Sequence, residues 1–306
     1  RNVVSWSALI SGYVQQGQGH EALNCFVEMK HNGISPDVIT FISILKACGS
    51  TCAIEKGKQI HEEIVSKGFL HKDIMLDNAL VDMYAKFGML AKAQQVLEEL
   101  PIRDVVSWNA LIAGYAQQGQ DCEALDCFGQ MQSENLCPDV VTFICLLKAC
   151  GRTGYKEKGI QIHQEVVKRG LLKKDIVLGT ALVDMYAKCG MLAKAHQMHD
   201  NLCDRNVSSW NMLIEGYMQN GRGHEALNCY EQMQGEGLFP NAVTLICILK
   251  ACGNMGAIGK GMSIHDRIVR NGFFVRKKKN IRRSEKTISR KKREGKKRKE
   301  NEHHSK

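Results

Sequence analysis

This 306-residue chain contains few prolines and no long apolar runs. It has four prolines against 28 glycines, which disfavours disordered or collagen-like chains and suits many helices joined by short glycine-containing turns. No uncharged apolar run approaches the roughly 18 residues of a membrane-spanning helix, so we expect no membrane span. The chain opens with Arg1-Asn2-Val3-Val4 rather than Met and lacks a signal-like apolar segment. We therefore expect a fragment whose targeting segment is missing.

Paired cysteine motifs are also missing. The 13 cysteines are odd in number and include no Cys-x-x-Cys pair, which argues against a disulfide framework and a zinc site. Cysteine is often buried and behaves as a small hydrophobe, so we expect reduced cysteines that pack in the interior, in a reducing compartment. An incidental thiol site is the alternative. Nine cysteines occupy homologous places of an internal repeat, although the ninth, Cys189, has Phe87 as its counterpart and matches only in place. The other eight are Cys25, Cys127, Cys229, Cys48, Cys150, Cys252, Cys145 and Cys247.

The net charge of +10 is unevenly distributed. Residues 276–306 hold 16 Lys or Arg against 4 Glu, a net charge of +12, whereas the other 275 residues hold 26 basic and 28 acidic side chains, a net of −2. High charge and low hydrophobicity predict a disordered basic tail. Three roles are open for it: non-specific attraction to phosphate, a nuclear import signal, or none at all, as a misread end of the chain.

Self-similarity organises the rest of the sequence. Trp6, Trp108 and Trp210 lie 102 residues apart, in the words WSALISGY, WNALIAGY and WNMLIEGY. TFISILKACG, TFICLLKACG and TLICILKACG recur with the same spacing, and ALVDMYAK occurs twice, at 79–86 and 181–188. Such a period is typical of a repeat architecture.

Each 102-residue unit contains shorter repeats of 35, 36 and 31 residues. In each, apolar residues at helical spacing are followed by a glycine-containing turn and a second amphipathic segment. Two short helices cannot bury their apolar faces alone, but stacked neighbours can. We therefore predict an all-α fold, an α-solenoid of about eight helical hairpins in a right-handed superhelix. The repeats are 3–37, 38–73, 74–104, 105–139, 140–175, 176–206, 207–241 and 242–277, within an array of residues 1–275 followed by the tail 276–306.

The alternating repeat length and three sequence words resemble the pentatricopeptide repeat family, in particular its plant PLS subclass. VVSWNALIAGYAQQG resembles its P motif, VVTFICLLKACG with GIQIH its L motif, and ALVDMYAKCG its S motif. We accordingly name 3–37, 105–139 and 207–241 the P repeats, 38–73, 140–175 and 242–277 the L repeats, and 74–104 and 176–206 the S repeats. Tetratricopeptide repeats have a similar shape, but they stay near 34 residues and rarely alternate in length.

The resemblance implies binding of single-stranded RNA, one nucleotide per repeat, through the first helix of each hairpin. The base-reading pairs would be the fifth and last residues of each P and S repeat: Ser7 with Asp37, Asn78 with Asp104, Asn109 with Asp139, Thr180 with Asn206, and Asn211 with Asn241. The last residue of each pair is also a good helix N-cap, which is the structural alternative. The side chains that would clamp each base occupy the second position: Val4, Met75, Val106 and Val177. Ser208 takes that place in the third P repeat, which weakens the expectation of stacking there.

The family's pairing preferences imply a target of G-n-U-U-n-A-Y. Ser7 with Asp37 resembles a guanine reader, the two Asn–Asp pairs resemble uracil readers, Thr180 with Asn206 resembles an adenine reader, and Asn211 with Asn241 a pyrimidine reader. The L repeats have isoleucine at the fifth position and Asp73 or Asp175 as the last residue of the first two. Because isoleucine cannot form hydrogen bonds, we expect these repeats not to discriminate bases. The isoleucines are Ile42, Ile144 and Ile246.

Two sequence patterns resemble parts of catalytic sites, but the internal repeat explains them better. Some members of the resembled subclass continue into a zinc deaminase domain with a His-x-Glu and a Cys-x-x-Cys. His61-Glu62-Glu63 and His163-Gln164-Glu165 fit the first part, but no Cys-x-x-Cys exists and the third copy reads His265-Asp266-Arg267. Asp82 and Asp184 are solitary acids on helices, which we expect to be solvated or capping groups. The sequence thus predicts a fragment without the deaminase domain, with no enzymatic activity, cofactor or metal site.

The predicted function is that of a sequence-selective RNA adaptor for organellar RNA editing or processing, in the mitochondrion or chloroplast by resemblance. Its partner is single-stranded RNA, and an editing or processing enzyme recruited in trans is left open. We expect neither association with a membrane nor a small-molecule substrate. The alternative is a helical scaffold that binds a protein partner in its concave groove, although such a groove need not repeat a polar fifth position in every P and S repeat.

Overall fold

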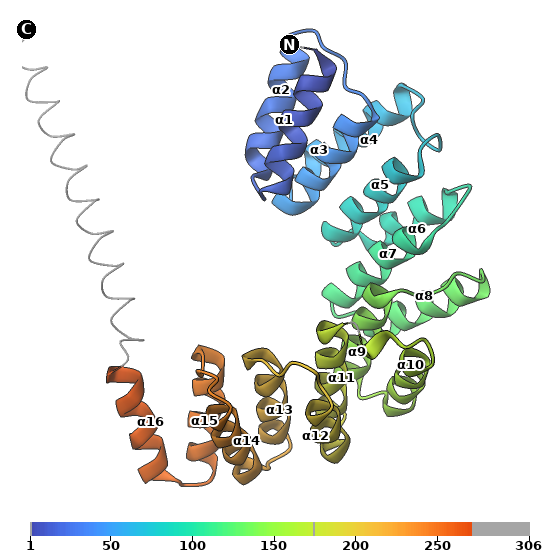
Figure 1. The fold of residues 1–306 in the computed structure, drawn as a ribbon. Coiled ribbons are helices and arrows are strands. Elements are labelled where there is room, and N and C mark those ends of the chain that lie inside the picture. The colour runs from blue at the N-terminus through green and yellow to red at the C-terminus, as the bar shows by residue number, and fades with distance from the viewer. Residues whose placement is uncertain (1, 174, 271–306) are drawn as a thin grey trace, which may run out of the picture. The chain divides into compact units, whose positions relative to one another are not determined.

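The computed structural model describes residues 2–173 and 175–270, which form sixteen α-helices and one 3₁₀ helix and contain no strand (Figure 1). This confirms the predicted all-α repeat fold with eight helical hairpins. The basic tail 276–306 and the end of the last predicted repeat lie outside the described residues. The helices are α1 (Val3–Gln15), α2 (Gly19–His31), α3 (Val38–Thr51), α4 (Ile54–Ser66), α5 (Ile74–Lys86), α6 (Leu90–Glu99), α7 (Val105–Gln117), α8 (Asp121–Ser133), α9 (Val140–Thr153), α10 (Lys156–Lys168), η1 (Leu171–Lys173), α11 (Ile176–Lys188), α12 (Leu192–Asp200), α13 (Val207–Gln219), α14 (Gly223–Gly235), α15 (Ala242–Asn254) and α16 (Ile258–Arg270).

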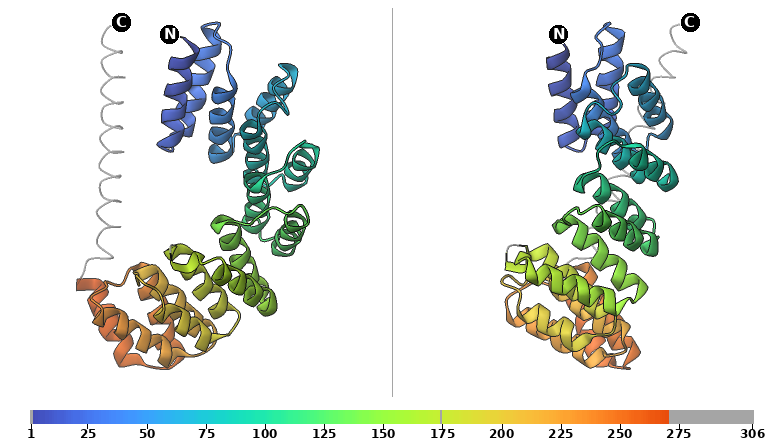
Figure 2. Two further views of the ribbon diagram at one scale, coloured as in Figure 1. Left: turned by 45° about the vertical axis from the view of Figure 1, so that its right-hand side comes forward. Right: turned by 90° about the vertical axis from the view of Figure 1, so that its right-hand side faces the viewer.

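The chain divides into two compact units, Arg1–Cys203 and Asp204–Lys306. In the first unit, each odd-numbered helix from α1 to α9 contacts the next odd-numbered helix, and each one from α1 to α11 contacts its own hairpin partner (Figure 2). In the second unit α13 contacts α14 and α15, and α15 also contacts α14 and α16. The odd-numbered helices of each unit therefore form a stacked row. A right-handed superhelix over the whole array stays a prediction.

An Asn or Asp side chain caps the start of every odd-numbered helix, where its oxygen accepts a hydrogen bond from a backbone N–H of the first turn. Such a cap stabilises a helix by about 1 kcal/mol. The even-numbered helices from α2 to α14 have no side-chain cap, and a tight turn leads into them instead. Gly119 illustrates this turn, because its φ of 75° is strained for other residues. The capping residues are Asn2, Asp37, Asp73, Asp104, Asp139, Asp175, Asn206 and Asn241.

The recurrent cysteines pack inside the stack. All nine are buried or half-buried, whereas Cys52, Cys122, Cys137 and Cys203, which do not recur, are exposed. Burial raises the pKa of the Cys48 thiol to about 11. This confirms the expectation that the repeated cysteines serve as packing residues. Among residues 2–173 and 175–270, no helix combines the length and apolar character needed to cross a membrane.

Candidate nucleic-acid interface

The first helices of four successive repeats line a cavity of about 520 Å³ in the first unit. Two of the predicted base-reading pairs meet in it, Asn78 with Asp104 and Asn109 with Asp139. The remaining lining comes from α3, α5, α7 and α9, the odd-numbered helices of this part of the chain. The structure therefore brings together residues that the sequence separates by as much as 99 positions, from Ile42 to Val141.

Each Asn of a P repeat is fixed by two hydrogen bonds. Asn109 Nδ2 donates to Asp139 Oδ1 at 3.0 Å, and Thr142 Oγ1 donates to Asn109 Oδ1 at 2.6 Å. Asp139 Oδ1 also accepts from the backbone N–H of Thr142 at 2.9 Å, as the cap of α9. The last residue of the repeat is thus both an N-cap and the partner of the fifth residue.

The third P repeat, in the second unit, repeats this arrangement. Asn211 Nδ2 donates to Asn241 Oδ1 at 3.1 Å, and Thr244 Oγ1 donates to Asn211 Oδ1 at 2.6 Å. Asn211 is only 4% exposed, and Asn109 is 9% exposed. The amide groups are therefore held in one orientation before any ligand arrives.

The first P repeat uses a hydroxyl in place of the amide. Ser7 Oγ lies 3.1 Å from Asp37 Oδ1 and 2.7 Å from Thr40 Oγ1. Burial acts to raise the pKa of the Asp37 carboxyl, but the hydrogen bonds from Thr40 and Ser7 outweigh it and lower the pKa. Asp37 therefore stays ionised and acceptor-only at neutral pH.

The pair of the first S repeat is less completely satisfied. Asn78 Nδ2 lies 3.1 Å from both carboxylate oxygens of Asp104. Its Oδ1 is buried and has no hydrogen-bond partner among the described residues. The reason is that Ser107 replaces the threonine found at this place in the L repeats, and its hydroxyl bonds to the backbone of Asp104 instead.

The pair of the second S repeat is divided between the two units. Thr180, in the first unit, donates its hydroxyl to the backbone oxygen of Ile176 at 2.8 Å. Asn206, in the second unit, accepts from the backbone N–H groups of Ser208 and Ser209 as the cap of α13. Their joint reading of a base stays a prediction.

The predicted clamping side chains project from the odd-numbered helices into solvent. Val4, Met75, Val106 and Val177 are between 59% and 67% exposed, although such side chains are usually buried. At the same position of the L repeats, Ile39, Val141 and Val243 are also exposed, although they were not among the expected clamping residues. The threonine that follows each of them was not expected to contribute either, although it recurs as the third residue of every L repeat.

The L repeats differ from the P repeats at the fifth position, where isoleucine replaces a polar residue. Ile42 and Ile144 are half-buried and Ile246 is exposed. Among the described residues, Asp73 and Asp175 hydrogen bond only to backbone N–H groups of the helices that they cap. In the first two L repeats, the fifth and last residues therefore form no hydrogen-bonded pair.

The residues with a catalytic appearance have structural roles. His61 Nδ1 lies 2.8 Å from the Tyr84 hydroxyl, and His163 Nδ1 lies 2.7 Å from the Tyr186 hydroxyl, so both histidines join an L repeat to the next S repeat. Asp82 and Asp184, which were expected to be solvated or capping groups, are half-buried and cap no helix. They lie inside helices, and each forms an ion pair with the lysine four residues later. In the part of the chain that the structure describes, no group of three His, Cys, Asp or Glu residues could hold a metal ion.

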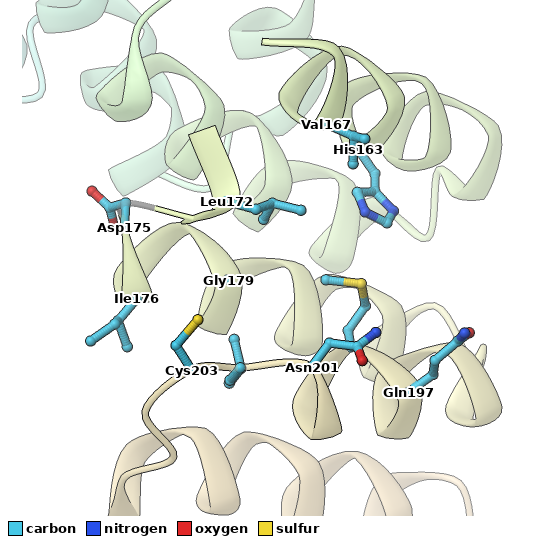
Figure 3. Close-up of a pocket in the computed structure, with 11 residues that line it drawn as sticks. His163, Val167, Leu172, Asp175, Ile176, Gly179, Gln197, Asn201 and Cys203 are labelled. Atoms are coloured by element: carbon cyan, nitrogen blue, oxygen red, sulfur yellow. The ribbon is translucent and has the colours of Figure 1, made fainter. Parts of the chain in front are cut away.

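A second cavity of about 500 Å³ lies beside His163, between α10, α11 and α12 (Figure 3). It opens beside Gly179, where the first S repeat has the buried Asp77. The carboxylate in its lining is that of Asp175, which caps α11. This cavity therefore has no second carboxylate in its lining for acid–base chemistry.

Known protein families and structures match most of the chain. The PPR repeat family model matches residues 1–50, 103–171 and 205–254, and the PPR repeat model matches residues 78–105 and 180–207. A pentatricopeptide repeat-containing protein of Arabidopsis thaliana is 38% identical over 261 residues, 85% of this chain and 36% of that protein. A putative mitochondrial one from the same plant is 40% identical over 270 residues, 88% of this chain and 43% of that protein. A chloroplastic one is 37% identical over 262 residues, covering 86% and 32%.

The fold also matches solved helical-repeat structures. The pentatricopeptide repeat protein PPR10, in complex with an 18-nucleotide psaJ RNA element, is 21% identical with a TM-score of 0.74, covering 89% of this chain and 40% of that chain. A tetratricopeptide repeat protein from Parabacteroides merdae is 12% identical with a TM-score of 0.51, covering 81% and 98%. The chain spans roughly a third to two fifths of the length of the plant relatives above. Because the repeat model covers more than half of its residues, the chain belongs to the pentatricopeptide repeat family.

Proposed function

We propose that this chain binds single-stranded RNA sequence-selectively, with one base per repeat. The observation that carries the proposal is the fixed pair of Asn109 and Asp139, which lies in a cavity together with a second such pair. A polar pair that is oriented before binding loses little conformational freedom when it meets a base. The related fold of PPR10, which was solved with RNA, supports the same function.

The geometry suggests how a base is read. Asn109 uses one amide hydrogen for Asp139 and its Oδ1 for Thr142, so its second amide hydrogen remains for a base edge. Exposed apolar side chains such as Val106 and Val141 flank this position along the row of helices. They offer surfaces against which the faces of a base can pack, while the polar pair contacts its edge.

The repeats would read G-n-U-U-n-A-Y. The pair Asn109–Asp139 reads the fourth base as uracil, and Thr180 with Asn206 reads the sixth as adenine. The L repeats accept any base, because no hydrogen-bonded pair exists at their fifth position. The division into repeats at residues 3, 38, 74, 105, 140, 176, 207 and 242 is part of this proposal, and these residues are the first of the odd-numbered helices.

The cellular role that fits this binding is that of an adaptor of the PLS subclass in organellar RNA editing or processing. Relatives that carry the names mitochondrial and chloroplastic support an organelle as its location. The chain would act without catalysis of its own and would recruit an editing or processing enzyme in trans. Incubation with labelled RNA, with and without zinc, should yield neither cleavage nor cytidine deamination.

A mobility-shift titration tests the binding proposal directly. A single-stranded RNA containing GNUUNAY should bind more tightly than RNAs of the same composition in scrambled order, and more tightly than duplex RNA. Equal affinity for cognate and scrambled RNA would remove the one-base-per-repeat proposal. Absence of RNA binding, together with capture of a defined protein by the same surface, would favour the scaffold alternative.

A further inference from the structure

RNA is a polyanion, yet residues 1–275 carry a net charge of only −2. The cavity that holds two base-reading pairs also contains the carboxylates of Asp82, Asp104 and Asp139. Proteins neutralise nucleic-acid phosphates with Lys and Arg. The phosphates of a bound strand therefore need cations on the same row of helices.

The odd-numbered helices carry six basic residues, and three of these are already paired. Lys86 Nζ lies 2.7 Å from Asp82 Oδ2, and Lys188 Nζ lies 2.8 Å from Asp184 Oδ2. Arg152 forms an ion pair with Asp121 and donates to the backbone oxygen of Ala116. The six residues are Lys46, Lys86, Lys148, Arg152, Lys188 and Lys250.

The other three, Lys46, Lys148 and Lys250, are exposed and make no ion pair within residues 2–173 and 175–270. Each belongs to an L repeat and follows its fifth-position isoleucine by four residues. Residues four apart lie on the same face of a helix, so each lysine extends from the face that carries the isoleucine. Lys46 lines the cavity together with Ile42, Asn78 and Asn109.

The position itself differs by repeat type. The equivalent residues are Ser11, Ala113 and Glu215 in the P repeats and Asp82 and Asp184 in the S repeats. At this position, within residues 2–173 and 175–270, an unpaired cation thus occurs only in the repeats whose fifth residue cannot form a hydrogen bond. This distribution fits a division between repeats that read a base and repeats that bind phosphate. A lysine is a point charge that attracts phosphate without reading sequence.

We infer that the L repeats bind the RNA backbone. Lys46, Lys148 and Lys250 each contact one phosphate, and these phosphates lie three nucleotides apart. The inference rests on the proposed RNA binding and assigns a role to the repeats that read no base. In this arrangement the P and S repeats supply sequence selectivity. The L repeats supply affinity and keep the strand in register between them.

The first test compares two triple variants of the full chain. One replaces Lys46, Lys148 and Lys250 by Gln. The control replaces Lys56, Lys158 and Lys260, one on the second helix of each L repeat, and so removes the same charge. Each single-strand phosphate contact contributes about 0.7 to the salt slope of log K, so the first variant should lower the slope by about 2. It should weaken cognate and scrambled RNA by the same factor, whereas the control should leave the slope nearly unchanged.

The second test places the contacts along the RNA. A neutral methylphosphonate replaces single phosphates in a cognate strand. Substitution beside nucleotides 2, 5 and 8, which face the L repeats, should weaken binding roughly two- to fivefold, the range of exposed ion pairs. The same substitutions should have no effect on the variant that lacks the three L-repeat lysines.

The outcomes separate this inference from the function on which it rests. If the unsubstituted chain binds no RNA, both the proposed function and the inference fail. If it prefers the cognate RNA but the two triple variants lower the salt slope equally, the inference alone fails. Methylphosphonate effects without a period of three would overturn it as well.

Discussion

Asn109 Nδ2 donates to Asp139 Oδ1 at 3.0 Å, across 30 residues of sequence. The same Asp139 oxygen caps α9 through the backbone N–H of Thr142. Asp139, which caps the first helix of one repeat, thereby orients Asn109 in the first helix of the preceding repeat. Any change that disturbs the cap should also disturb the group proposed to read a base.

Thr142→Val should reduce both stability and base selectivity. Valine preserves the shape but removes the hydroxyl that donates to Asn109 Oδ1. An unsatisfied buried polar atom costs about 1–3 kcal/mol, so the free energy of unfolding should fall by that amount. The preference for uracil at the fourth base should weaken because the amide is free to turn. Urea denaturation and Kd values on four single-base variants measure the two effects.

Thr142→Ser is the matched control for this change. It retains the hydroxyl and the cap of α9 and should keep most of the stability and the preference for uracil. A valine variant that discriminates bases as well as the serine variant would show that Thr142 does not orient the amide.

Thr180→Asn combined with Asn206→Asp should change the preference at the sixth base from adenine to uracil. The double change recreates the pair formed by Asn109 and Asp139. A base that is stacked and hydrogen bonded contributes roughly 1–3 kcal/mol, so the ranking of single-base variants should reverse by a measurable margin. An unchanged ranking in the Kd series would mean that these residues do not read the sixth base together.

The hairpins could be predicted from the sequence because three nearly identical copies share one pattern. The fifth and last residues also could be located, since an Asp or Asn ends each P and S repeat. The hydrogen bond between Thr142 and Asn109 could not, because helical periodicity tells which face a residue occupies and not which atom it meets 33 residues away. Ion pairs such as Asp82–Lys86 were overlooked, although their spacing of four residues was visible in the sequence.

Local differences between copies were harder to predict than the shared fold. Asp77 and Gly179 occupy the same place in the two S repeats. The Asp77 carboxylate accepts from the backbone N–H of His71 at 3.2 Å, whereas a Cβ at Gly179 would lie 2.5 Å from Leu202 Cδ2. A single difference between copies therefore replaces a buried polar contact by close apolar packing. The repeat pattern does not predict such a difference, because this position is not one of its apolar positions.

Gly159→Ala should destabilise the chain. A methyl group at this position would lie 2.5 Å from Met185 Sδ and 3.0 Å from its Cε. Met185 is fully buried in α11, so the added methyl must displace packed atoms, at a cost of about 1–3 kcal/mol. Thermal or urea denaturation measures the loss.

Gly129→Ala, in helix α8, provides the opposite case. No atom lies within 4 Å of an added methyl there, and alanine favours a helix over glycine by roughly 0.5–1 kcal/mol. This variant should therefore gain stability. Equal effects of the two substitutions would contradict the close packing of α10 against α11.

His61 and His163 should make the chain less stable in mild acid. Burial lowers the pKa of both imidazoles below the ordinary value of 6.5, with Lys92 and Lys194 adding to the effect. Above that value both histidines are neutral in the folded and the unfolded chain. Below it the unfolded chain binds more protons, so the free energy of unfolding falls as the pH decreases toward the folded-state pKa. Urea denaturation at about pH 7.5 and about pH 5.5 should show the decrease.

The double variant His61→Gln and His163→Gln should lose this part of the pH dependence. Glutamine can still hydrogen bond to the hydroxyls of Tyr84 and Tyr186, but it does not titrate. His20→Gln with His224→Gln is the control, because both histidines are exposed on second helices, and it should keep the full decrease. If the two double variants respond to acid alike, the buried histidines are not the source of the acid sensitivity.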